Sequence, residues 1–189
     1  MKLLKTLFKV FLITFVCLIV YMTYSCNTPG NLQSPSFLNE EIEEIVHLKS
    51  NRSIRNTEVS SADISWHLDH MLLVINRIYE ALEKSDPNAY KASFNVPRIM
   101  MFSFKSIPRG RAKSPDLVRP KDSITLAIIE GHLKNAQLNL EKFDSLPENS
   151  NFVHPFIGQL NREQSKRFIK IHTQHHLKIC NDILKASGK

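Results

Sequence analysis

Histidine is the residue type in this sequence whose spacing could support chemistry. The segment HTQHH at 172–176 places His172 and His176 four residues apart, and residues i and i+4 share one face of a helix. Helical zinc and iron sites present two imidazoles at this spacing. Apolar residues bracket the pair, so we expect both rings to point inward and His175 to lie at the edge. A hydrogen-bonded pair of core histidines has the same pattern, so spacing alone leaves both readings open.

A third ligand could come from the segment WHLDH at 66–70, which contains His67 and His70. Three neutral imidazoles leave coordination positions open for water or substrate, as catalytic rather than structural metal sites do. Helical periodicity favours His67, because it lies nearer than His70 to the seam of apolar residues at Leu68, Met71 and Ile75.

The other candidates have ordinary structural interpretations. We expect His154, just before Pro155, to fix a loop by a hydrogen bond, Trp66 to be a partly buried residue at a helix start, and Cys180 to fill apolar space. Lining the site is the alternative for each of them. Asp63 and Asp69 could orient an imidazole or serve the helix start. Glu130 is the nominal candidate for a general base, and surface positions are expected for His47 and His132.

The elements that must position these residues are predicted from the prolines. Stretches 36–86, 121–146 and 156–189 contain none, whereas five of nine prolines lie between 87 and 120. Because proline breaks helix interiors, we expect helices over 37–49, from a Ser60/Ser61 cap to about 84, over 122–143, and from a capping box at Asn161 to 188. Strand alternation is weak. The prediction is an all-α four-helix bundle with a long crossover loop at 86–121.

The N-terminus indicates membrane attachment. Lys2, Lys5 and Lys9 precede an uncharged apolar run over 10–24, which orients the N-terminus inside and the rest outside the cytoplasm. An uncleaved anchor, a lipoprotein signal acylated at Cys26 and a cleaved secretory peptide remain alternatives. Ser25 fits the lipoprotein pattern and Tyr24 departs from it. We therefore divide the chain into a signal or anchor segment over 1–26, a tether over 27–36 and a bundle domain over 37–189.

Charge and composition exclude several classes of protein. With 42% apolar and 23% charged residues the composition is globular, and three cysteines make a disulfide framework improbable. The net charge of +7 is concentrated in the N-terminal lysines and in the loop 105–121, which has six basic residues and one acid. This distribution argues against a nucleic-acid binder. The basic loop could receive an anionic substrate or lipid headgroups, and a solvated loop is the alternative. No phosphate-binding glycine loop, GxSxG or CxxC motif occurs.

These features together resemble the DinB-like (YfiT-type) metalloenzyme superfamily. The resemblance spans roughly 37–186 and is sharpest over 152–184, where HPFIGQLNREQSKRFIKIHTQHHLKICNDIL resembles a domain-of-unknown-function branch with an HPxFG-like turn before the last helix. Ile157 stands where that branch often has an aromatic residue. The resemblance implies a four-helix bundle holding one divalent metal, zinc or nickel, through His70, His172 and His176.

Family register therefore selects His70 where periodicity favours His67, and we follow the register. The resemblance implies metal-dependent hydrolysis or thiol transfer on an unknown small-molecule substrate. From the N-terminal segment we expect the domain to be tethered to the membrane on its extracytoplasmic (periplasmic) side, and a homodimer is left open. The alternative is a non-catalytic metal-binding or scaffold bundle at the cell envelope. A fourth protein ligand, His67 or His154, would favour that alternative.

Overall fold

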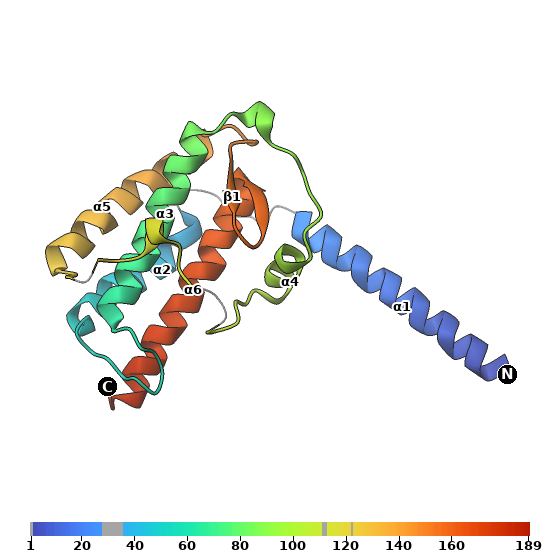
Figure 1. Cartoon of the computed structure of the whole chain (residues 1–189), viewed down its shortest axis with the longest axis horizontal. Coiled ribbons are helices and arrows are strands. Elements are labelled where there is room, and N and C mark those ends of the chain that lie inside the picture. Colours follow the sequence, from blue (N-terminus) through green and yellow to red (C-terminus); the bar gives the residue numbers. More distant parts are fainter. Residues whose placement is uncertain (1, 28–35, 111–112, 122) are drawn as a thin grey trace.

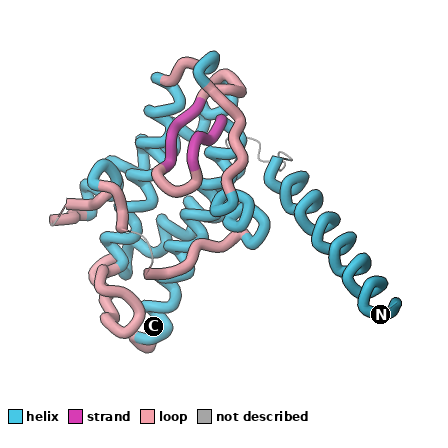
Figure 2. Tube along the Cα trace, turned by 45° about the vertical axis from the view of Figure 1, so that its right-hand side comes forward, coloured by secondary structure: helices cyan, strands magenta, loops and turns pink. Residues whose placement is uncertain are grey.

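The computed structural model describes residues 2–27, 36–110, 113–121 and 123–189. The expected tether lies almost wholly outside these ranges, as does the side chain of Cys26. The described chain is mostly helical, as predicted, and carries one small sheet. Figure 1 shows its elements coloured along the sequence, and Figure 2 distinguishes helices, strands and loops from a second angle.

Four helices lie near their predicted positions and pack around one core. They are α2 (Asn39–Leu48), α3 (Ile64–Lys84), α5 (Leu126–Lys142) and α6 (Arg162–Ala186). Helix α3 is central, because α5 and α6 both pack along it, and α2 contacts α6 and α3 (Figure 1). The predicted seam of α3, from Ile64 through Leu68 and Ile75 to Leu82, is fully buried. The predicted stripe of α5 is also buried, so both amphipathic patterns identify the core.

Helices α3, α5 and α6 begin at side-chain caps. Asn161 caps α6 in a reciprocal capping box with Gln164, which confirms that prediction. The expected Ser60/Ser61 cap of α3 is wrong, since Asp63 accepts the hydrogen bond from the backbone N–H of Trp66. Thr125 caps α5, which therefore begins later than expected.

The loop 86–121 contains a helix that was not predicted, α4 (Val96–Phe104), and short 3₁₀ turns at Pro87–Ala89 and Asp116–Val118. Proline in the first turn of a helix loses no hydrogen bond, so Pro97 is compatible with α4. The expectation that the prolines exclude a helix from this loop is therefore wrong. The inner face of α4 buries Arg98 and Phe102.

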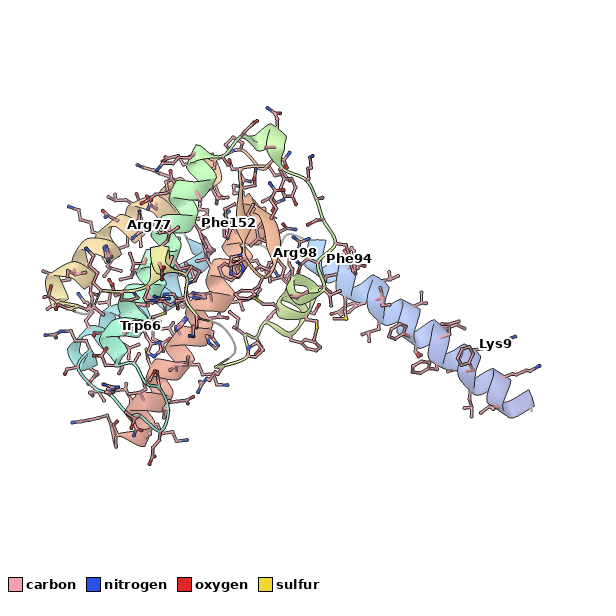
Figure 3. All side chains as sticks on the ribbon, in the orientation of Figure 1. Lys9, Trp66, Arg77, Phe94, Arg98 and Phe152 are labelled. Carbon is pink, nitrogen blue, oxygen red and sulfur yellow. The ribbon has the colours of Figure 1, made fainter. Side chains whose placement is uncertain are left out.

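A short antiparallel hairpin precedes α6, where only a turn was expected. Strands β1 (Asn151–His154) and β2 (Gly158–Asn161) pair with Phe152 opposite Leu160. Each strand has four residues, too few for alternation to be visible. Buried Arg98 attaches the hairpin to α4, because its guanidinium donates to the carbonyls of Gln159 (2.8 Å) and Ile157 (3.4 Å) (Figure 3).

The N-terminal helix α1 (Lys2–Asn27) extends away from this core (Figure 1). Its stretch Leu4–Tyr24 is long and apolar enough to cross a membrane, since 21 residues at ~1.5 Å each match a hydrocarbon core of ~30 Å. A signal sequence has the same properties. The helix includes Lys5 and Lys9, so it is longer than the uncharged run. The end of α1 contacts α4.

Candidate metal centre

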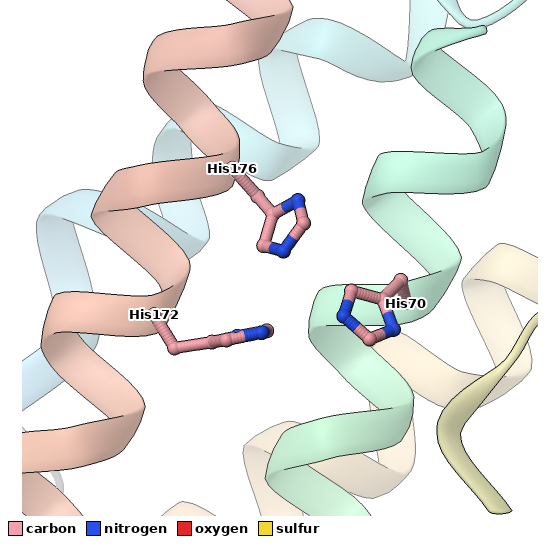
Figure 4. Close-up of side chains that lie close together, drawn as sticks. All are labelled: His70, His172 and His176. Atoms are coloured by element: carbon pink, nitrogen blue, oxygen red, sulfur yellow. The ribbon is translucent and has the colours of Figure 1, made fainter. Parts of the chain in front are cut away.

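Three histidines from two helices converge on one point between α3 and α6. His70 comes from α3, and His172 and His176 come from successive turns of α6 (Figure 4). One ring nitrogen of each lies within 4.8 Å of the corresponding nitrogens of the other two. The i, i+4 spacing on α6 and the packing of α6 along α3 together produce this arrangement.

His70 is held by a backbone carbonyl. Its Nδ1 lies 2.7 Å from the carbonyl oxygen of Val118, in the 3₁₀ turn at Asp116–Val118. A carbonyl can only accept, so Nδ1 carries the hydrogen and Nε2 keeps its lone pair. The indole of Trp66 stacks on the His70 ring, with centroids 4.9 Å apart and planes 23° apart. Both contacts restrict rotation of the imidazole.

His176 is held by a second histidine. Its Nδ1 lies 3.0 Å from Nδ1 of His67. The other nitrogen of His67, Nε2, lies 3.0 Å from Oγ of Ser60, which also accepts from the backbone N–H of Ala62. A row of hydrogen bonds therefore runs from His176 to the loop before α3, and it leaves Nε2 of His176 available.

His172 lacks a hydrogen bond at one of its two ring nitrogens. Its Nδ1 is buried and has no hydrogen-bond partner among the described residues. The ring is packed instead against His176 and Phe168, at centroid distances of 4.6 and 5.5 Å. A buried polar atom without a partner costs free energy, so this ring is suited to an additional interaction that the protein alone does not supply.

Burial keeps these imidazoles neutral. It lowers the pKa of His70, His172 and His176, and repulsion from neighbouring imidazoles lowers the pKa of His172 and His176 further. Burial, then His70, lowers the pKa of His67 to about 4. Metal ions bind neutral imidazole, so the donors already have the required protonation state at pH 7.

The donor set fits a divalent ion. Metal–nitrogen bonds of about 2.0–2.1 Å bring two ligand nitrogens to roughly 3.3–4 Å, and nitrogens within 4.8 Å can reach that separation by small side-chain rotations. The unpartnered Nδ1 of His172 and the fixed tautomer of His70 support the same conclusion.

The two histidines of helix α3 have different places. Both are buried, with 4% and 3% of their surface exposed for His67 and His70 respectively. His70 joins the pair on α6, as the resemblance implies. His67 lies outside this group of three, and its Nδ1 contacts Nδ1 of His176. Periodicity favoured His67 because it identifies residues near the apolar seam, but a buried histidine there can support a ligand as well as be one.

Two further histidines lie at the margin. Nδ1 of His154 accepts from the backbone N–H groups of Phe156 (3.2 Å) and Ile157 (3.4 Å), which is the expected loop-fixing role. Burial lowers the pKa of His154 to about 4. His175 is half-buried, and its ring stands perpendicular to that of His176 at 5.1 Å.

The acidic candidates are engaged elsewhere. Asp69 does not orient His70, because adjacent helical residues point ~100° apart; it pairs at 2.6 Å with His132, which is accordingly not a free surface residue. Glu130 is exposed and pairs with Lys49 at 3.0 Å, so it is wrongly placed for a general base. Asp63 serves the helix start. Cys180 is buried, which raises its pKa to about 12 and makes it a neutral core residue.

The basic loop contributes to the site in a way that charge did not predict. Its Val118 supplies the carbonyl that holds His70, and backbone carbonyls carry no signal in a sequence. Arg109 pairs with Asp182 of α6 at 2.6 Å, and Arg119 pairs with Asp116. The sequence predicts Ser60 only as a helix cap, whereas in the structure its Oγ contacts Nε2 of His67.

Comparison with known proteins adds no further identification. No protein-family model, no curated protein and no solved structure matches this chain.

Proposed function

We propose that the chain binds one divalent metal ion, zinc or nickel, through His70, His172 and His176. The observation that carries the proposal is the convergence of three neutral imidazoles whose ligand nitrogens lie within 4.8 Å. Imidazole ligands suit zinc, nickel, copper and iron, so the donor set agrees with the expected metals without choosing between them.

Metal binding would set the protonation of the surrounding hydrogen bonds. With Nε2 of His176 as ligand, its Nδ1 carries a hydrogen and donates to Nδ1 of His67. His67 then donates from Nε2 to Oγ of Ser60. Each histidine in this row has one donor and one acceptor nitrogen, as a neutral imidazole requires, and such support typically raises ligand basicity.

The fold supports the proposed family. The chain has four helices, α2, α3, α5 and α6, around one core, and the three histidines come from the second and fourth of them, as the resemblance implies. The hairpin with its His154-Pro155 turn occupies the position of the HPxFG-like segment. We propose membership of the DinB-like superfamily on these grounds.

We propose a membrane location with the domain on the extracytoplasmic side, and helix α1 supports the membrane location. The proposal of orientation depends on the lysines at its start. An uncleaved anchor and an acylated Cys26 both keep the domain at the membrane.

For the reaction we propose metal-dependent hydrolysis or thiol transfer. A bound divalent ion supplies Lewis acidity, which activates water or a thiol and polarises a carbonyl. The protein holds His70 and His176 through Val118 and His67, and Trp66 covers one face of His70. Both ring nitrogens of His67 contact other side chains, Nδ1 that of His176 and Nε2 that of Ser60, so His67 is not placed as a fourth ligand, which favours an enzyme over a scaffold.

Metal analysis of the full chain in detergent tests the binding proposal. We expect one zinc or nickel per chain in the parent and in the control His47→Ala, whose histidine is exposed on α2, and none in His172→Ala. Trp66 is the only tryptophan and stacks on His70, so open-shell Ni²⁺ should quench its fluorescence in the parent and the control alone. Absence of stoichiometric metal under several metal supplies would refute the proposal.

Substitution with Co²⁺ separates the enzyme from the scaffold. An open coordination position should take up azide or a small thiol and change the visible spectrum. A spectrum that neither addition changes would indicate a closed site and favour the scaffold.

A further inference from the structure

Helix α4 has one face that the described part of the chain does not cover. Its inner face is held by buried Arg98 and Phe102, and Arg167 of α6 donates to the carbonyl of Phe102 and lies over its ring at 4.8 Å. Its outer face presents Val96, Met100 and Phe104, which are 52%, 49% and 67% exposed. These residues have the i, i+4, i+8 spacing of a single helical stripe.

The residue before the N-cap extends this stripe. Phe94 is 74% exposed and lies two residues before α4. We call Phe94, Val96, Met100 and Phe104 together the α4 face. Contiguous exposed apolar side chains on a helix whose opposite side is firmly packed mark an interaction surface.

The position of the α4 face indicates what covers it. The end of α1 contacts α4 (Figure 1), and Figure 3 shows Phe94 beside it. Among the described side chains of α1, only Met22 and Thr23 are half-buried, and they lie at the end of the stretch Leu4–Tyr24. A bilayer that contains this stretch therefore has its surface at the level of α4.

Charge around the α4 face is complementary to a lipid surface. Apart from buried Arg98, the segment 87–115 has five Lys and Arg residues and no Asp or Glu. Exposed Lys91 and Lys105 flank the residues of the α4 face in the sequence. Anionic headgroups attract such residues, and amphipathic helices of this composition lie in the interface with aromatic and aliphatic side chains inserted.

We propose that the α4 face docks on the lipid bilayer beside the point where α1 enters it, so that the domain lies against the membrane. The proposal rests on membrane insertion of α1 and is independent of the metal. Docking would give the domain a fixed orientation, with α4 toward lipid and α5 away from it.

Lipid quenching in the full chain tests this. Phe104→Trp and the control Leu138→Trp each place one added indole at an exposed apolar position, on α4 and α5 respectively. The proteins are reconstituted into vesicles of phosphatidylcholine and phosphatidylglycerol in equal amounts, with or without brominated acyl chains. The parent supplies the Trp66 background, and resistance to carbonate extraction reports insertion of α1 separately.

Brominated chains should quench Phe104→Trp strongly, by several-fold more than the parent, and should leave Leu138→Trp at the parental level. Equal quenching of the two variants in carbonate-resistant protein would overturn the proposal. A blue-shifted but unquenched Phe104→Trp would also overturn it, because a second copy of the chain would then cover the α4 face. Neither result would affect the metal proposal.

Discussion

Replacing His67 tests whether it supports a ligand or is one itself. His67→Ala removes the hydrogen-bond partner of Nδ1 of His176, 3.0 Å away, and leaves that nitrogen in a buried environment. Loss of such a contact to a metal ligand typically weakens metal binding 10–100-fold, which corresponds to about 1.4–2.8 kcal/mol. We therefore expect His67→Ala to retain one metal per chain with a dissociation constant raised by about one to two orders of magnitude.

His67→Gln is the informative companion. A glutamine can accept from Nδ1 of His176 through its carbonyl and donate to Ser60 through its amide, so it should recover part of the lost affinity. His132→Ala is the matched control, because the ring of His132 also makes a side-chain hydrogen bond, but to Asp69 outside the cluster.

Competition with a chromophoric zinc chelator measures the zinc affinity of the parent, His67→Ala, His67→Gln and His132→Ala. His172→Ala, measured alongside, gives the affinity expected when a ligand is lost. The reasoning would be refuted by an unchanged affinity in His67→Ala, since the hydrogen bond would then contribute nothing. It would equally be refuted by a loss as complete as that of His172→Ala, since His67 would then be a ligand.

Three further predictions concern the stability of the fold: its pH dependence through His154, the anchoring role of buried Arg98, and the cap of α6 at Asn161. Unfolding of the full chain in detergent tests each of them. Folded His154 has a pKa lowered to about 4, whereas the unfolded residue takes up a proton near 6.5. Its contribution is therefore present above pH 6.5 and lost as pH falls towards 4. Between pH 7 and 5 the parent should lose about 1–2 kcal/mol more than His154→Gln in urea titrations; parallel losses would contradict this. Arg98→Met should cost about 1–3 kcal/mol and speed amide exchange in β1 and β2 but not in α5, and unchanged exchange in the hairpin would count against its anchoring role. Asn161→Ala should lower stability by about 1 kcal/mol, with Asn161→Asp close to the parent; thermal melts that rank the two alike would disprove the capping role.

The helices that carry the site could be predicted because their signals are local. The seam from Ile64 to Leu82 and the capping box at Asn161 each depend on residues within a few turns of one another. Local reasoning was wrong at two places, because a nearby residue supplied the cap or a proline stood at a permitted position. Asp63 displaced Ser60 as the cap of α3, and Pro97 began a helix in the segment that proline seemed to exclude.

The hairpin and α4 could not be predicted, because distant residues stabilise them. Arg98 holds Gln159 across 61 residues of sequence, and Arg167 holds Phe102. Neither pairing has a local signal. Four-residue strands and a nine-residue helix are also too short for periodicity to identify them.

The sequence by itself determined that His172 and His176 share one helix face, that His67 lies near the apolar seam of its helix, and that an apolar segment precedes the domain. These properties follow from the spacing of residues along single helices. The tertiary structure decided that His70 meets the pair while His67 supports His176 from behind, and that Val118 and Ser60 orient the two rings. It also decided that α4 presents an apolar face beside the end of α1. Such distinctions depend on which atoms of separate elements come within hydrogen-bond or van der Waals distance, and chain spacing does not specify that.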